Sequence, residues 1–82
     1  MKVRIEELKE IARQVLDLLG VRDYFDLQLT YALKIEGKWK VNFQYELHQH
    51  VFGSSAIRKI ASFTIDAESG EIEGMWLDRS WR

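Results

Sequence analysis

Three side chains near the middle of the chain could carry chemistry, namely Glu46, His48 and His50. They occur at every second position, so in an extended strand they would share one face. Two imidazoles and a carboxylate are ligands for a transition metal, and a histidine titrating near neutrality could act as an acid or base. Two histidines are only part of a ligand set, however, and no nucleophile accompanies them. We therefore expect a polar strand end on the solvent face, without metal, cofactor or enzyme activity.

A second candidate site is a basic and aromatic cluster in the C-terminal part of the chain. Arginine interleaved with tryptophan can stack on single-stranded nucleic acid, and the residues concerned are Arg58, Lys59, Trp76, Arg79, Trp81 and Arg82. Acidic side chains crowd the same region, and the whole chain carries 12 Lys+Arg against 13 Asp+Glu, a formal net charge of −1. Such a balance gives no field that would hold a polyanion. We expect no nucleic-acid partner.

The N-terminal part must form a helix. Aliphatic side chains recur there at steps of three and four residues and span an arc of about 160°, wider than the usual stripe of about 100°. They are Ile5, Leu8, Ile11, Ala12, Val15, Leu16, Leu18 and Leu19. The spacing predicts a helix over residues 4–19, and Gly20 follows it as a C-terminal cap in the left-handed conformation.

Two strands follow, over residues 27–36 and 38–49, where apolar and polar residues alternate. Alternation is typical of a strand with one buried face. A three-residue loop of Ile35, Glu36 and Gly37 would set Leu33 opposite Trp39, so that the odd-numbered residues of both strands face the core. On this pattern we assign the aromatic residues to the core, namely Tyr31, Trp39, Phe43, Tyr45 and Phe63.

Two further strands are predicted over residues 57–66 and 71–77. Lys59 and Ile60 break the alternation of the first, which indicates a bulge or an edge position. In the turn between them Asp66 can accept hydrogen bonds from backbone N–H groups, and Gly70 takes the left-handed position. This turn sets Ile65 opposite Ile72. The core side of the last strand would then hold Ile72, Gly74 and Trp76, and the other side Met75 and Leu77.

The expected fold is one α+β domain over residues 1–82, an N-terminal helix packed on a curved four-stranded antiparallel meander. Four strands make a sheet about 19 Å wide, whereas a helix is only about 10–12 Å across. The sheet must therefore curl, or a partner or second copy must cover the remainder. We expect a protein partner or a homodimer, bound through Met75, Trp76, Leu77, Arg79 and Trp81.

The chain resembles the PepSY domain family. The resemblance rests on the helix with Gly20 after it, on the strand around Val41, and on the closing hairpin from Phe63 to Ile72, whose turn reads Asp-Ala-Glu-Ser-Gly-Glu-Ile. It implies a cystatin-like α+β module that binds or inhibits without catalysis. The chain is also similar, more weakly, to gas-vesicle accessory proteins of the O type. The residues that match are Trp39, Asp66, Gly70, Glu71, Arg79 and Trp81.

These observations predict a small non-enzymatic protein-interaction or regulatory module, PepSY-like, that binds through the sheet face or the C-terminal tail. The alternative is a small ligand- or metal-binding domain or enzyme with its site near Glu46, His48 and His50. Charges interrupt the first 20 residues, and no run approaches the ~20 apolar residues of a membrane span, so we expect a soluble, cytoplasmic protein. The chain has no cysteine and therefore no disulfide framework.

Overall fold

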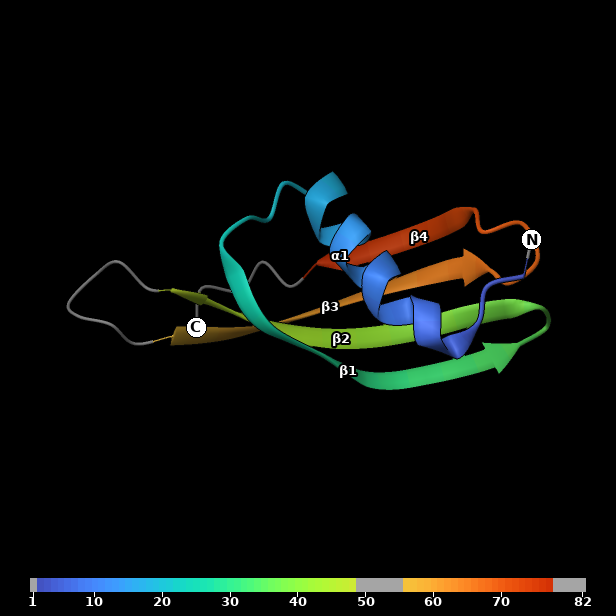
Figure 1. Cartoon of the computed structure of the whole chain (residues 1–82), viewed down its shortest axis with the longest axis horizontal. Coiled ribbons are helices and arrows are strands. Elements are labelled where there is room, and N and C mark those ends of the chain that lie inside the picture. The colour runs from blue at the N-terminus through green and yellow to red at the C-terminus, as the bar shows by residue number, and fades with distance from the viewer. Residues whose placement is uncertain (1, 49–55, 78–82) are drawn as a thin grey trace.

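The computed structural model describes residues 2–48 and 56–77. In chain order these form a short 3₁₀ helix η1 (Ile5–Glu7), helix α1 (Leu8–Leu18) and strands β1 (Tyr24–Ile35), β2 (Lys38–His48), β3 (Ala56–Asp66) and β4 (Ile72–Leu77). The strands pair antiparallel in the order β1-β2-β3-β4, and α1 lies across one face of the sheet (Figure 1). The predicted α+β arrangement of an N-terminal helix on a four-stranded antiparallel sheet is confirmed.

Helix α1 ends in a Schellman motif at Gly20. The Gly20 N–H donates to the Asp17 carbonyl at 3.1 Å and the Val21 N–H to the Leu16 carbonyl at 2.9 Å, while Gly20 has a φ of 79°. The predicted glycine cap is therefore confirmed. Within residues 2–48 and 56–77, no helix is long and apolar enough to cross a bilayer.

The core lies between α1 and the two central strands. The helix contributes buried side chains that recur at helical spacing, and β2 contributes buried residues at every second position: Leu8, Ala12, Val15 and Leu16 face Val41, Phe43 and Tyr45. The Phe43 ring lies 5.9 Å from that of Phe63 and 6.2 Å from that of Tyr45. Ile5 and Leu18 are exposed, so the buried stripe of the helix is narrower than the predicted arc.

The N-terminal segment closes one end of this core. The Val3 N–H donates to the Ala67 carbonyl at 2.6 Å, and the Val3 carbonyl accepts from the Trp39 indole N–H at 3.0 Å. Val3 and Ala67 are both buried. Because Ala67 begins the turn after β3, these bonds join the first residues of the chain to both β2 and the β3–β4 hairpin.

Candidate interaction surface

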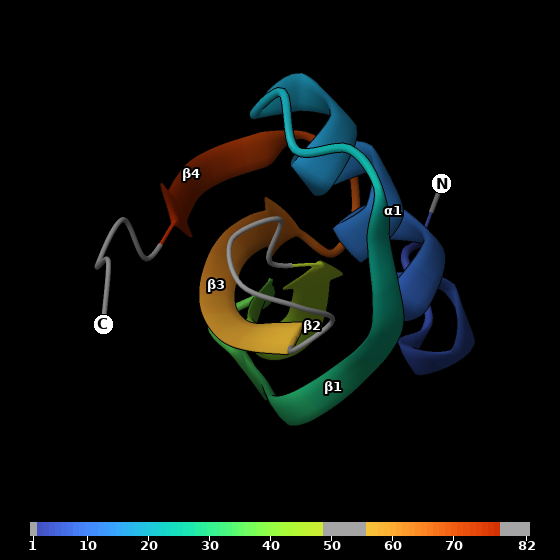
Figure 2. The same ribbon diagram turned by 90° about the vertical axis from the view of Figure 1, so that its left-hand side faces the viewer.

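The sheet face opposite α1 carries large exposed apolar side chains. Figure 2 shows β1 and β4 as the outer strands, with α1 along one side of the sheet. Residues of β2 that lie between the buried ones point away from α1, and their cross-strand partners share that face. In the described part of the chain, the apolar side chains on this uncovered face are Phe25, Tyr31, Leu33, Ile35, Ile60 and Trp76, which are 37–56% exposed.

Strand β1 reverses its faces partway along, contrary to the prediction. Glu36 and Gly37 have φ values of 52° and 75° and form a two-residue turn, so Ile35 pairs with Lys38 and Leu33 pairs with Lys40 rather than Trp39. A register shift between Leu29 and Tyr31 then restores the inward orientation of the first half of the strand. Tyr31, Leu33 and Ile35 therefore lie on the uncovered face, and the assignment of Tyr31 to the core was wrong.

Strand β4 contains a second reversal. Ile65 pairs with Ile72 as predicted, but Thr64 pairs with Gly74, so the register shifts between them. Met75 and Leu77 consequently lie on the helix side, opposite Phe63 and Ala61, and Trp76 lies on the uncovered face. The predicted facing of β4 is confirmed for Ile72 and was wrong from Gly74 to Leu77. Of the five predicted partner-binding residues, Trp76 is thus separated from Met75 and Leu77, while Arg79 and Trp81 lie outside the described residues.

Strand β3 pairs with β2 in an unbroken register, so the pairing has no bulge at Lys59 and Ile60. The described part of β4 pairs only with residues 61–65 of β3, so Lys59 and Ile60 lie at an edge of the described sheet, which is the other form of the prediction. Lys59 lies on the helix side opposite Tyr45, and Ile60 lies on the uncovered face opposite Gln44. Arg58 and Lys59 accordingly face opposite sides of the sheet and do not form one basic patch. Arg79, Trp81 and Arg82 of the predicted cluster fall outside the described residues.

Across its middle, the uncovered face is apolar on the two outer strands and polar on the two inner ones, while Ile60 adds an exposed apolar side chain farther along β3. One row across the sheet shows this directly, because Trp76 pairs with Ser62, Ser62 with Asn42, and Asn42 with Tyr31. The apolar groups on β1 form a continuous stripe of Tyr31, Leu33 and Ile35 along the outer strand. A partner could therefore contact either apolar edge without burying the charged lysines of β2.

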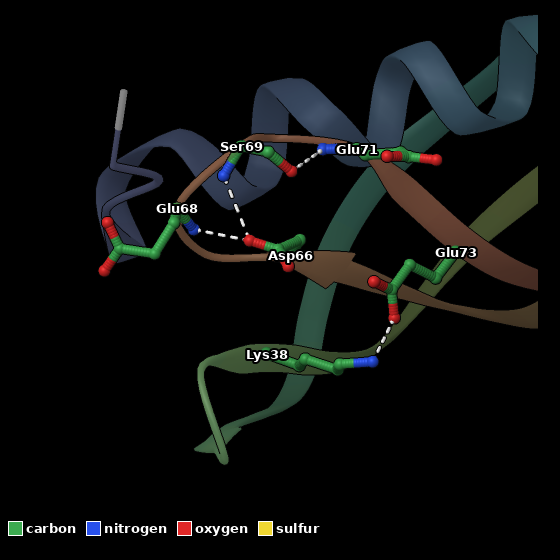
Figure 3. Close-up of polar contacts among 6 residues, drawn as sticks. All are labelled: Lys38, Asp66, Glu68, Ser69, Glu71 and Glu73. Atoms are coloured by element: carbon green, nitrogen blue, oxygen red, sulfur yellow. Dashed lines mark hydrogen bonds and ion pairs between the residues drawn. The ribbon is translucent and has the colours of Figure 1, made fainter.

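One end of the uncovered face is held by an ion pair. The Lys38 ammonium lies 2.6 Å from the Glu73 carboxylate, which reaches across from β4 (Figure 3). This hydrogen bond, together with the Glu73 charge, raises the pKa of Lys38 above its ordinary value of 10.5. Both groups are substantially exposed, so the pair orients the strands here more than it stabilises them.

The turn after β3 is organised by Asp66. Its Oδ1 accepts from the Ser69 N–H at 3.0 Å and from the Glu68 N–H at 2.8 Å, and the Ser69 Oγ accepts from the Glu71 N–H at 3.2 Å (Figure 3). The hydrogen bonds from Ser69 and Glu68 lower the pKa of Asp66 below its ordinary value of 3.8. Gly70 has a φ of 78°. Both predicted roles in this turn are confirmed, and they are structural.

Two of the candidate metal residues, Glu46 and His48, share the uncovered face of β2, and each lies beside a side chain from a neighbouring strand. The His48 ring stacks on Phe25 at 4.6 Å with an interplanar angle of 25°, and a Glu46 oxygen lies 3.9 Å from the Arg58 guanidinium. His50 lies outside the described residues. Among residues 2–48 and 56–77, no group of three or more His, Cys, Asp or Glu side chains is placed to hold a metal ion.

Sequence reasoning missed the apolar stripe on β1. The signal that could have found it is Gly37, because glycine readily takes the positive φ that the second residue of a two-residue type I′ turn requires. Such a turn pairs odd-numbered residues of β1 with even-numbered residues of β2. Leu33 must then share a face with Lys40.

Comparison of the chain with protein-family models, with curated proteins and with solved structures gave no match.

Proposed function

We propose that the protein is a small non-enzymatic interaction module that binds a protein partner through the uncovered face of its sheet. The observation that supports this most is the set of apolar side chains on that face, from Phe25 on β1 to Trp76 on β4, which stay exposed while comparable residues pack beneath α1. The continuous part of this set is the stripe of Tyr31, Leu33 and Ile35 along β1, and contiguous exposed apolar surface is typical of interaction sites. Arg79 and Trp81, which lie outside the described residues, are part of this proposal as further partner contacts.

The module is PepSY-like and cystatin-like in our proposal, with a sheet that curves around α1. Support comes from the order of one helix and a four-stranded meander, and from the Asp66–Ile72 turn with its buried Ala67. Curvature would let a helix about 10–12 Å wide cover more of a sheet about 19 Å wide. A cytoplasmic location is part of this proposal.

The test is site-specific photocrosslinking of the full chain in cells. A benzophenone amino acid replaces Leu33 on the uncovered face or, as the matched control, Gln14 on the exposed side of α1. We expect a cross-linked polypeptide from position 33 at a yield several-fold above that from position 14. The additional change Trp76→Lys should lower that yield if the partner spans the face. Equal yields at positions 33 and 14 would overturn the proposal.

A further inference from the structure

The outer edge of β1 is open along its regular half. From Tyr31 to Ile35 every residue pairs with β2 without a register shift, whereas both irregularities of the strand lie before Tyr31. Among the described residues, no backbone hydrogen bond outside the strand ladders reaches β1. An unpaired regular strand edge is a template for another strand. The same five residues carry the apolar stripe of Tyr31, Leu33 and Ile35.

The hairpin turn determines which backbone groups face this open edge. A two-residue turn is flanked by a hydrogen-bonded pair, here Ile35 and Lys38, and hydrogen-bonded pairs alternate with non-hydrogen-bonded ones along an antiparallel ladder. The N–H and C=O groups of Ile35, Leu33 and Tyr31 therefore point toward β2. Those of Ala32 and Lys34 point outward, where a new strand would bind them.

We propose, as the specific form of the interaction proposed above and resting on it, that the partner is a second copy of this chain, paired antiparallel along the open edge of β1. The two-fold axis passes between the two Leu33 residues. Ala32 and Lys34 of each copy then exchange four backbone hydrogen bonds with Lys34 and Ala32 of the other. Each Tyr31 lies opposite Ile35 of the other copy, an aromatic and β-branched pair of the kind that stabilises sheets.

Charge and packing select this register over its neighbours. A two-fold axis at Lys34 would set two lysines directly opposite each other, which is destabilising. An axis at Ala32 would set Ile35 opposite Leu29. Because of the register shift at Thr30, Leu29 lies on the helix side of the sheet and Ile35 on the uncovered face, so the two side chains would not meet. The axis at Leu33 places Lys34 opposite Ala32 and joins both apolar stripes into one patch on the uncovered face. A second copy matches this register, because the apolar residues Tyr31, Leu33 and Ile35 are spaced symmetrically about Leu33.

The pairing surface is small, which determines how the dimer should behave. Five paired residues extend about 17 Å at ~3.4 Å each. Such an interface falls below the roughly 1,200 Å² of standard complexes, in the class of weak and transient ones. We therefore expect reversible, concentration-dependent association rather than a permanent dimer, with dissociation in the micromolar range or weaker.

The register is tested by disulfide trapping, which is clean because the chain has no cysteine. Leu33→Cys would bring its thiol opposite itself in a non-hydrogen-bonded pair, within the Cα separation of about 4.4–6.8 Å that a disulfide needs. Tyr31→Cys and Ile35→Cys would each lie about 14 Å from its own copy. In an oxidised-glutathione buffer we expect two samples to form disulfide-linked dimers quickly, namely Leu33→Cys alone and Tyr31→Cys mixed with Ile35→Cys. Their rates should be at least tenfold above those of the controls, which are Tyr31→Cys, Ile35→Cys and Gln14→Cys, each by itself.

A substitution that removes one backbone N–H group tests the same dimer without introducing a thiol. Lys34→Pro removes an outward N–H, whereas the matched variant Lys34→Thr removes the same charge and retains that N–H. Sedimentation from about 10 μM to 1 mM should show the dimer in Lys34→Thr and its loss in Lys34→Pro, with circular dichroism checking that both fold. If Lys34→Pro unfolds, the cysteine rates decide. Equal trapping rates, or a monomer throughout for the unsubstituted chain, would overturn the inference.

Failure of this inference is distinguishable from failure of the proposed function. If Leu33→Cys does not trap but the photocrosslinker at position 33 captures a different polypeptide, the interaction surface stands and the second copy is wrong. If neither reagent reacts above its control at Gln14, both the surface and the second copy are wrong. Capture of an extended peptide along β1 would replace the second copy by another strand at the same edge.

Discussion

At the residue scale, the titration of Asp66 should contribute to the loss of stability in acid. Backbone N–H groups of Ser69 and Glu68 bind its ionised form and lower its pKa below 3.8. A lowered pKa in the folded state contributes stability above the unfolded pKa, which is lost as the pH falls through the folded pKa. The free energy of unfolding in urea, measured at decreasing pH, should therefore fall as the pH drops below the ordinary aspartate pKa of 3.8. In Asp66→Asn this fall should be smaller. The control Glu68→Gln, in the same turn, should keep the full loss of stability at low pH. The same pH dependence of the free energy of unfolding in Asp66→Asn as in the unsubstituted protein would contradict this role of Asp66.

Phe43 and Tyr31 test which aromatic residues form the core. Phe43 is fully buried against Tyr45 and Phe63, whereas Tyr31 is half exposed. Truncation of a buried phenylalanine to alanine costs about 3–5 kcal/mol, while surface changes stay within about 0.5 kcal/mol. We expect Phe43→Ala to approach the first value and Tyr31→Ala the second when the free energy of unfolding is measured by urea denaturation. Comparable losses would return Tyr31 to the core.

At the element scale, the sequence predicted the strands better than their faces. Alternation over β2 correctly indicated Val41, Phe43 and Tyr45 as inward, because an uninterrupted strand keeps one period. It failed after Thr30 and before Gly74, where one extra residue reverses the period. A bulge is decided by pairing with the neighbouring strand, so the composition of one strand does not predict it. The facing of Trp76 could not be predicted for that reason, whereas the facing of Leu33 and Ile35 follows from the two-residue turn at Glu36 and Gly37.

The backbone of Glu36, in the turn between β1 and β2, is strained, and a substitution at this residue should relieve the strain. Glu36 has a φ of 52°, and a left-handed conformation costs most L-residues about 1–2 kcal/mol whereas asparagine adopts it more readily. Glu36→Asn should therefore raise the free energy of unfolding by about 0.5–1 kcal/mol in urea denaturation. Glu36→Gln removes the same charge but keeps the strain, and it should change little. A gain of equal size in Glu36→Gln would assign the effect to charge instead.

At the scale of the whole molecule, the hydrophobic core and the proposed interaction surface lie on opposite faces of one sheet. Every fully buried large side chain of the described residues lies in the cluster around α1, whereas Leu33 and Trp76 lie on the uncovered face, which no described helix crosses. The fold should therefore tolerate changes on the second face that would be severe on the first. A chain of 82 residues can keep such a surface only because its core is concentrated on β2, β3 and α1.

This separation predicts that charge on the uncovered face removes binding surface without removing stability. The double variant Leu33→Lys and Trp76→Lys should bind an apolar fluorescent dye several-fold less than the unsubstituted protein, since both side chains are exposed on that face. Its free energy of unfolding should change by no more than about 1 kcal/mol, the sum of two surface substitutions. The control, Ile5→Lys with Leu18→Lys, replaces even more exposed apolar residues of η1 and α1 and should leave dye binding nearly unchanged. If the control lowers dye binding as much, the apolar surface used for binding lies on the helix instead.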